Sequence, residues 1–361
     1  MPQFLNSREN AVTEAIDGVL MASAGALSRL DGFPHIRVVV RSDWDKSKVA
    51  IVSGGGSGHE PAHAGFVGRG MLTAAVCGDV FASPSVDAIL AAILAVTGPL
   101  GCLLIVKNYT GDRLNFGLAA ERARAFGLNV GMVIVDDDIA LPDLPQSRGV
   151  AGTLFVHKIA GAMAENGASL DAVIDTARRV IANIRSIGIS LDTCTVPGSP
   201  KEARIPEGRA ELGLGIHGEA GVEQIEYDGV RGAVAAMVDR LAVGMEDKPH
   251  VVLINNLGGT SVLEMAVVLN ELVQSAIGER ISHIVGPAPL MTSLDMQGFS
   301  ISVMPAEKAD LDLLAKPVDL AAWPGVTAIR PVNLIALPDG LTPIAPLASQ
   351  HLPTRQFLTE C

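Results

Sequence analysis

Charged, aromatic and cysteine residues are scarce in this sequence of 361 residues. Charged residues make up 18% and aromatic residues 4%, and acidic residues exceed basic ones to give a formal net charge of −12. The deficit of positive charge argues against a surface for nucleic acid or anionic membranes, so we expect neither partner. The four cysteines form no CxxC pair and no metal-ligand spacing. This pattern favours free thiols and a cytoplasmic location.

Long hydrophobic runs are also missing. No apolar stretch reaches the roughly twenty residues that span a bilayer. The N-terminal residues MPQFLNSREN are polar, and we expect no signal peptide. The sequence is nevertheless 48% hydrophobic and long enough for two domains. Because small and aliphatic residues dominate, the composition favours an α/β protein.

Short apolar runs alternate with helical patterning in the first half of the chain. Each run ends in a polar loop, and this order is typical of a parallel α/β sheet. The expected strands span 49–52, 101–106 and 130–135, and a helix is expected over 86–96. Ligands of such sheets bind at the carboxyl ends of the strands. We therefore expect one crevice to be shared by the loops at 53–60, 107–112 and 136–138.

The pattern changes near residues 185–190, where 187–196 alternates like an antiparallel strand. We therefore expect two α/β domains. The first, 1–187, carries a largely parallel sheet, and the second, 188–345, carries a mixed sheet. Residues 346–361 are more polar and without pattern, which indicates a tail or linker.

The most distinctive stretch is VAIVSGGGSGHEPAHAGF at 49–66. An apolar run leads into Ser53, a glycine-rich segment and His59. Glycine permits positive φ and lets a ligand approach the main chain closely. The segment therefore predicts a loop that binds an anionic or hydroxylated ligand. A simple glycine turn is the alternative, although a turn needs fewer glycines.

Three known motifs compete for this stretch. A P-loop requires Lys-Ser or Lys-Thr after the glycines, and the dinucleotide fingerprint requires a glycine where His59 or Pro61 stands. The zinc pattern HExxH matches His59 to His63, but it binds zinc only on a helix. Pro61 suits the first position of the next helix, so the two histidines should diverge. We expect no metal here.

A second histidine, His217, lies within GLGIHGEAG at 213–221. A core histidine usually has bulky neighbours, whereas flanking glycines leave the imidazole accessible to a ligand. A glycine turn with an incidental histidine is the alternative.

Five motifs, in order, closely resemble those of the dihydroxyacetone kinases. They are SGGGSGHEP (53–61), GDVFASPS (78–85), KNYTGD (107–112), GIHGE (215–219) and NNLGG (255–259). The resemblance is to the substrate-binding, DhaK-type subunit or domain and covers residues 10 to 340. Segments 74–90 and 107–121 resemble the ATP-dependent kinases more than the phosphotransferase-system subunits.

The resemblance implies a covalent site. In that family the histidine of GIHGE, here His217, binds the substrate carbonyl as a hemiaminal through Nε2. The GSGH segment, here Gly56, Ser57, Gly58 and His59, holds the substrate, and its histidine takes part in proton transfer. Lys107 and Asp112 contact the bound triose. The implied catalytic residues are His59, Asp112 and His217, with either His59 or Asp112 as the principal base.

The family's nucleotide domain binds Mg-ATP through an aspartate-rich GDGDxG-type motif, which this sequence lacks. Asp136, Asp137 and Asp138 could hold Mg²⁺, but acids at strand ends are more often turns and caps. The chain thus resembles the substrate half of a glycerone kinase of glycerol metabolism. It should hold no cofactor, form a homodimer and receive phosphate from Mg-ATP on a partner domain or subunit. The alternatives are a dihydroxyacetone sensor without phosphoryl transfer and a kinase for a related ketose such as erythrulose.

Overall fold

The computed structural model describes residues 3–32, 36–141 and 147–338. The chain divides into two compact units, Met1–Ile329 and Arg330–Cys361. All the helices and strands given below belong to the first unit. The tail or linker expected at 346–361 lies outside the described residues.

The first sheet is largely parallel, as the sequence predicts. In the described part of the chain it has six strands in the order β1-β2-β4-β3-β5-β6. Strands β4, β3, β5 and β6 pair in parallel, whereas β1 and β2 join antiparallel. The bounds are β1 Leu27–Arg29, β2 Val38–Arg41, β3 Ala50–Ser57, β4 Ala74–Val80, β5 Cys102–Lys107 and β6 Val130–Val135.

The second sheet is mixed, which is also as predicted. Over the described residues its order is β13-β11-β10-β12-β7-β8-β9, with β10 and β11 parallel and the other pairs antiparallel. The expected domain boundary at 187/188 falls inside β7, and both sheets belong to one compact unit. The bounds are β7 Arg185–Ser190, β8 Arg209–Leu212, β9 Glu223–Glu226, β10 His250–Asn256, β11 Ile281–Ala288, β12 Gly298–Pro305 and β13 Val326–Ala328.

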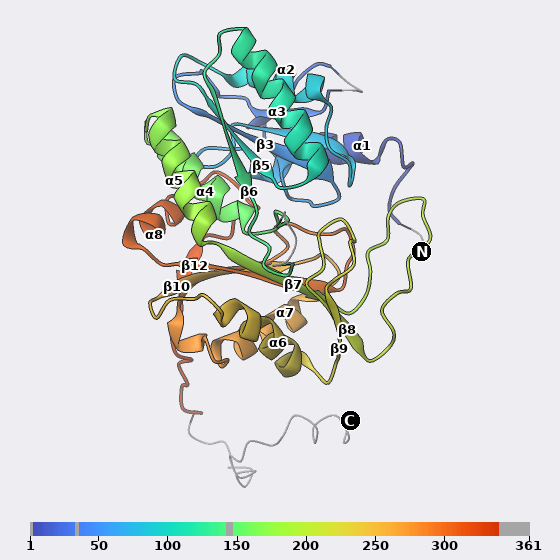
Figure 1. The fold of residues 1–361 in the computed structure, drawn as a ribbon. Helices are drawn as coiled ribbons and strands as arrows, with labels where there is room; N and C mark the ends of the chain where they lie inside the picture. The colour runs from blue at the N-terminus through green and yellow to red at the C-terminus, as the bar shows by residue number, and fades with distance from the viewer. Residues whose placement is uncertain (1–2, 33–35, 142–146, 339–361) are drawn as a thin grey trace. The chain divides into compact units, whose positions relative to one another are not determined.

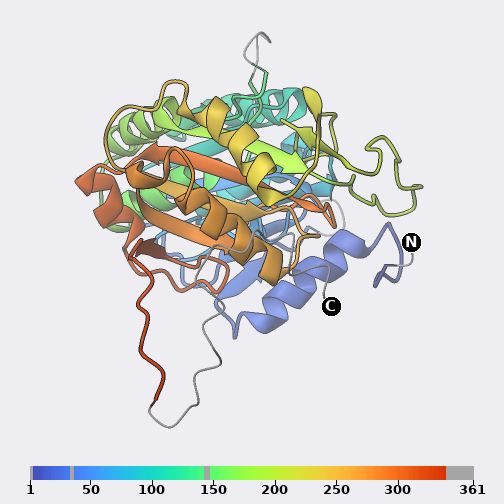
Figure 2. The ribbon, with the colours of Figure 1, turned by 90° about the horizontal axis from the view of Figure 1, so that it is seen from below.

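Helices cover both sheets in layers (Figure 1). Helices α2 and α3 pack on the first sheet, at the top of Figure 1, and α6 and α7 pack on the second, at the bottom. Figure 2 shows α6 and α7 side by side on the second sheet. The helices are α1 Ala11–Ala22, α2 Val86–Val96, α3 Thr110–Ala125, α4 Thr153–Glu165, α5 Leu170–Asn183, α6 Val230–Ala242, α7 Val262–Val273 and α8 Lys308–Leu314, with 3₁₀ turns η1 Ala64–Phe66 and η2 Gly278–Arg280.

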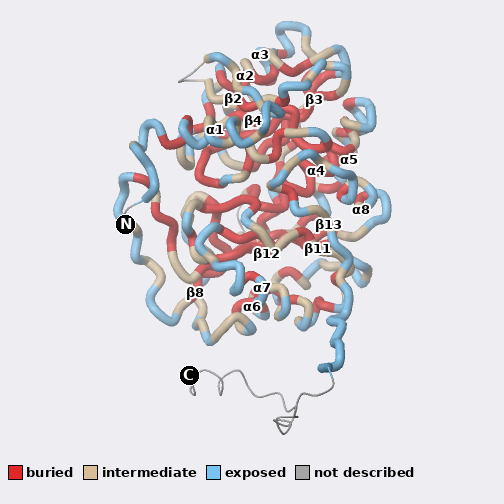
Figure 3. Tube along the Cα trace, turned by 180° about the vertical axis from the view of Figure 1, so that it is seen from behind, coloured by how far each residue is buried: buried red, intermediate tan, exposed pale blue. Residues whose placement is uncertain are grey.

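One hydrophobic core is shared by the two sheets. It contains Ile51 and Leu103 of the first sheet, Val251 and Leu253 of the second, and much of α4 and α5. The buried segments of both layers are visible in Figure 3. Burial of this shared apolar surface holds the two sheets together. None of the helices in the described residues is long and apolar enough to cross a bilayer.

Candidate functional site

Two histidines that are distant in sequence meet between the sheets. The ring centroids of His59, after β3, and His217, after β8, lie 4.8 Å apart at an interplanar angle of 73°. Phe81 stacks on His59 with a centroid distance of 5.2 Å, and Tyr109 meets His217 edge-on at 4.4 Å. The site is therefore a histidine pair with aromatic neighbours.

The geometry of His59 fixes its tautomer. Its Nδ1 lies 2.8 Å from the carbonyl oxygen of Thr292, which can only accept, so Nδ1 carries the proton. Its Nε2 is then a lone-pair acceptor, buried and without a hydrogen-bond partner among the described residues. Burial, with the nearby His217 and Lys107, holds the pKa of His59 well below its usual value. His59 is thus a neutral base with its basic nitrogen free.

His217 is oriented by Glu219. The carboxylate accepts the His217 backbone N–H at 2.8 Å and lies 3.1 Å from Nδ1 of the ring. Burial alone would raise the pKa of Glu219, but its hydrogen bonds with His217 lower that pKa to about 2. Glu219 is therefore ionised and accepts a hydrogen bond from Nδ1–H of His217, which leaves the ring's lone pair on Nε2.

The glycine-rich segment is the end of a strand, and our expectation of a loop starting at Ser53 is wrong. Strand β3 continues through Gly54, Gly55 and Gly56 to Ser57. A Cβ on Gly54 would lie 2.2 Å from the carbonyl oxygen of Val76, and one on Gly55 would lie 2.7 Å from Nζ of Lys107. Gly55 also has a φ of 147°. The glycines thus admit the neighbouring strand and the lysine.

Lys107 and Asp112 come from the end of β5 and the first turn of α3, and both are buried. Nζ of Lys107 lies 2.7 Å from Nε2 of His63 and 3.3 Å from the carbonyl oxygen of Gly54. Asp112 Oδ1 has no hydrogen-bond partner within the described ranges. Buried polar atoms are rarely left unpaired, so Asp112 Oδ1 and His59 Nε2 mark a place for a polar ligand.

The helix expected from Pro61 does not form. Residues 60–63 are turns, and the next regular element is the short 3₁₀ turn η1. His59 faces Thr292 while His63 faces Lys107, so the HExxH letters lack the helical geometry that zinc ligation requires. No group of three or more His, Cys, Asp or Glu side chains suited to a metal lies among the described residues.

Two of the three aspartates after β6, Asp137 and Asp138, have structural partners. Asp137 accepts the backbone N–H groups of Val150 and Gly152 at 2.8 and 2.9 Å, and burial raises its pKa to about 6. Asp138 accepts a hydrogen bond from Arg148 at 2.7 Å. These contacts join β6 to the segment that begins α4, in keeping with a capping role.

Several residues of the site were not singled out from the sequence. Tyr109, Phe81 and Glu219 lie inside the KNYTGD, GDVFASPS and GIHGE motifs, so membership of a motif was the available signal. Thr292 gave no signal, because it contributes only backbone and hydroxyl contacts from a loop of the second sheet.

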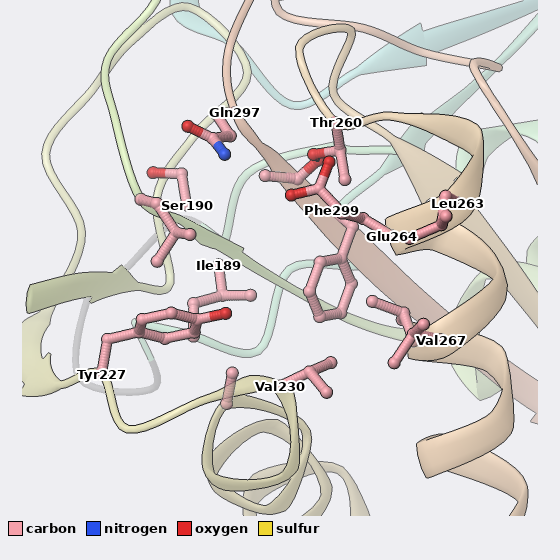
Figure 4. Close-up of a pocket in the computed structure, with 14 residues that line it drawn as sticks. Ile189, Ser190, Tyr227, Val230, Thr260, Leu263, Glu264, Val267, Gln297 and Phe299 are labelled. Carbon is pink, nitrogen blue, oxygen red and sulfur yellow. The ribbon is translucent and has the colours of Figure 1, made fainter. Parts of the chain in front are cut away.

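A separate apolar groove of about 220 Å³ lies between α6, α7 and the second sheet (Figure 4). Ile189, Val230, Val267 and Phe299 form its apolar walls, and Tyr227 borders it. None of the predicted site residues lines this groove. The histidine pair therefore remains the candidate active site.

The fold and the site define an α/β protein in which the rings of His59 and His217 meet between two sheets. The family model described as the Dak1 domain matches residues 17–322. The chain belongs to the Dak1 domain family.

Similar proteins include the dihydroxyacetone kinase of Citrobacter freundii, 52% identical over 92% of this chain and 61% of that protein. A putative 3,4-dihydroxy-2-butanone kinase of Solanum lycopersicum is 49% identical over 93% of this chain and 59% of that protein. The dihydroxyacetone-binding subunit DhaK of the PTS-dependent dihydroxyacetone kinase 1 of Listeria innocua is 43% identical over 90% of this chain and its whole length, 100%. The chain thus spans about three fifths of the first two relatives.

Two solved structures agree with this fold. The native dihydroxyacetone kinase of C. freundii superposes with a TM-score of 0.91 at 51% identity, covering 93% of this chain and 62% of that one. The dihydroxyacetone kinase operon co-activator Dha-DhaQ gives a TM-score of 0.80 at 31% identity, covering 86% of this chain and 98% of that one.

Proposed function

We propose that this chain is the substrate-binding half of a dihydroxyacetone kinase and holds the hydroxyketone as a hemiaminal on His217. The observation that carries the proposal is the pairing of His217 Nδ1 with the ionised Glu219 at 3.1 Å. This pairing directs the lone pair of the ring to Nε2, the atom that would attack the carbonyl carbon.

The reaction on His217 balances without a co-reactant. The C–N bond forms as the carbonyl π pair moves to oxygen. The oxygen gains one proton and becomes a hydroxyl, and the imidazole loses its Nδ1 proton. The hemiaminal therefore contains all the atoms of the ketone and the imidazole. A small triose offers little surface for binding, and a reversible bond supplies affinity that contacts alone would not. Glycerol has no carbonyl and would be rejected.

The next step is phosphoryl transfer to a terminal hydroxyl of the held ketone. Such transfer depends mainly on positioning and on charge stabilisation. His59 Nε2 and Asp112 Oδ1 are the candidate bases, because both are buried and lack a partner in the described structure. Lys107 would donate to a substrate oxygen. Mg-ATP would come from a partner domain or subunit, and the chain would act as a homodimer in the cytoplasm.

The adduct can be tested with dihydroxyacetone labelled with ¹³C at its carbonyl. Binding should move the carbon resonance from the ketone to the tetrahedral region, and His217→Ala should abolish the change. His283→Ala, in β11 and outside the site, is the matched control and should keep it. A borohydride-reducible imine on a lysine, or no adduct at millimolar ligand, would contradict the proposal.

Phosphoryl transfer separates the kinase from a sensor. The 31% identical co-activator Dha-DhaQ keeps the sensor alternative open, and the Solanum relative keeps a four-carbon hydroxyketone open. The isolated chain should not phosphorylate dihydroxyacetone with ATP at a useful rate. Addition of a nucleotide domain from the family should give turnover. Adduct formation without turnover under any such pairing would favour the sensor, and comparison with erythrulose would identify the preferred ketose.

A further inference from the structure

Lys107 is a fully buried ammonium, and a histidine outside the three catalytic residues governs its hydrogen bonds. Its Nζ lies 2.7 Å from Nε2 of His63. An ammonium has donors only, so His63 Nε2 must accept and the ring proton must lie on Nδ1. Gly54 takes a second, longer hydrogen bond from Nζ at 3.3 Å.

Behind His63 lies a second buried histidine, His157 of α4, with ring centroids 5.2 Å apart. Ser53 donates its single hydroxyl proton to the carbonyl oxygen of Ile105 at 2.7 Å. Ser53 Oγ must therefore accept from His157 Nε2, 3.1 Å away. This assigns the proton of His157 to Nε2 and makes its Nδ1 a lone-pair acceptor.

Both rings are neutral. His63 and His157 are 4% and 0% exposed. Burial, together with the charge on Lys107, lowers the pKa of His157 to about 3 and that of His63 well below its usual value. A second positive charge beside a buried ammonium would be strongly unfavourable. His63 is thus a neutral ring whose Nε2 can accept a hydrogen bond from the charged Lys107.

The ammonium of Lys107 lies beside Gly55 and Asp112 of the candidate site. A Cβ on Gly55 would lie 2.7 Å from Lys107 Nζ and 3.3 Å from Asp112 Oδ2, so both polar groups border the same glycine. With one hydrogen donated to His63 and one to Gly54, the third N–H of the ammonium has no hydrogen-bond partner among the described residues.

We propose that His63 is a positioning residue: by accepting one hydrogen of Lys107 at Nε2, it aims the remaining N–H of the ammonium at an oxygen of the bound hydroxyketone. The inference rests on the proposed function, since it takes Lys107 as a ligand contact. His63 itself would touch no substrate. His157 and Ser53 support its ring from behind.

The arrangement has a consequence for pH dependence. The charged and titratable groups that surround Lys107 are His59 and His63 after β3, Asp112 of α3, Asp137 after β6 and His157 of α4. Burial lowers the pKa of Lys107, and Asp112 and Asp137 oppose that shift. Loss of the acceptor on His63 should lower this pKa further. The ammonium is lost as pH rises through its pKa, so the alkaline limit of ligand binding should move to lower pH.

The test uses the full chain, ¹³C-labelled dihydroxyacetone and two variants. His63→Met removes the acceptor at similar volume and should weaken binding about tenfold or more, the scale of a lost hydrogen bond to a charged group. In this variant the alkaline limit of dihydroxyacetone binding should move to lower pH. His63→Gln retains an acceptor near the position of Nε2 and should recover most of the affinity and the wild-type limit. Equal effects of the two variants, or an unchanged limit in His63→Met, would overturn the proposal.

Two further measurements separate the possible failures. If the wild-type chain forms no adduct, the proposed function fails before the role of His63 is tested. Ring ¹⁵N resonances of wild-type His63 need no variant at all and should report a proton on Nδ1 and a bare, hydrogen-bonded Nε2. A proton on Nε2 would contradict the inference even if the variants did not fold.

Discussion

Glu219 holds His217 through two hydrogen bonds at once, one to its backbone N–H at 2.8 Å and one to its ring Nδ1 at 3.1 Å. The residue between them, Gly218, has a φ of 80°, a left-handed conformation that glycine adopts readily. The turn brings the carboxylate back onto the ring that precedes it. The orientation of the nucleophile is therefore a property of one short loop.

Glu219→Gln should weaken the dihydroxyacetone adduct. The amide keeps the size of the side chain but replaces a charge-assisted hydrogen bond with a neutral one, which is about half as strong. We expect about a tenfold loss of affinity, measured by titration with the ¹³C-labelled ligand. Glu223→Gln on the exposed strand β9 is the matched control and should bind normally. Wild-type affinity in Glu219→Gln would show that the loop orients His217 without the charge.

Asp112→Asn should separate binding from chemistry. The change keeps the side-chain volume and removes the basicity of Oδ1, while His217 and Glu219 are untouched. We expect the adduct to form and turnover with a nucleotide domain to fall about a hundredfold or more, the usual scale for a lost general base. Adduct and turnover should be measured on the same preparation, with Asp175→Asn on α5 as control. Normal turnover would leave His59 as the base.

Gly55→Ala should damage both stability and binding. The new Cβ would lie 2.7 Å from Lys107 Nζ, and a φ of 147° is unfavourable for any side chain. We expect the free energy of unfolding to fall by more than about 1 kcal/mol, measured in urea, with loss of the adduct. Gly117→Ala in α3 is the control, because no described heavy atom lies within 4 Å of the position that its new Cβ would take. That change should raise the unfolding free energy by about 0.5–1 kcal/mol.

His157 should contribute to acid sensitivity. Its pKa falls from 6.5 to about 3 on folding, mainly through burial. Between these values the unfolded chain binds a proton that the folded chain does not, so stability is lost as pH falls through this window. His157→Gln removes this titration and should reduce the change in urea midpoint between neutral pH and about two units lower. An unchanged difference would mean that other groups, such as His59 and His63, dominate. Any loss of packing in His157→Gln should appear as a lower urea midpoint at neutral pH.

Elements set by local pattern were predictable from the sequence. The expected helix over 86–96 is α2, because Ser85 caps it through the N–H of Ala88 and its apolar residues face the sheet. The strand expected at 130–135 is β6 with the same bounds. These segments carry their own signals of periodicity and capping, and distant contacts agree with them.

The site was less predictable where distant contacts decide. Nothing local reveals that Gly54 must admit the carbonyl of Val76, so a strand end resembles a loop. Likewise, the segment after His59 is a turn whose histidine meets Lys107, a contact across 44 positions in the sequence. Motif resemblance identified His59 and His217 as partners, but their orientation depends on Thr292 and Glu219, which only the structure reveals.

The hydrogen bond between His59 Nδ1 and the carbonyl oxygen of Thr292 makes the site depend on the folding of both sheets. His59 follows the first sheet, yet the carbonyl that dictates which of its nitrogens is basic comes from a loop of the second. A chain in which only the first sheet has folded would carry an imidazole free to tautomerise and exposed to protonation by water. His59 can therefore act as a neutral base only when both sheets have folded. During refolding, the sheets should form before His59 acquires its free, basic Nε2.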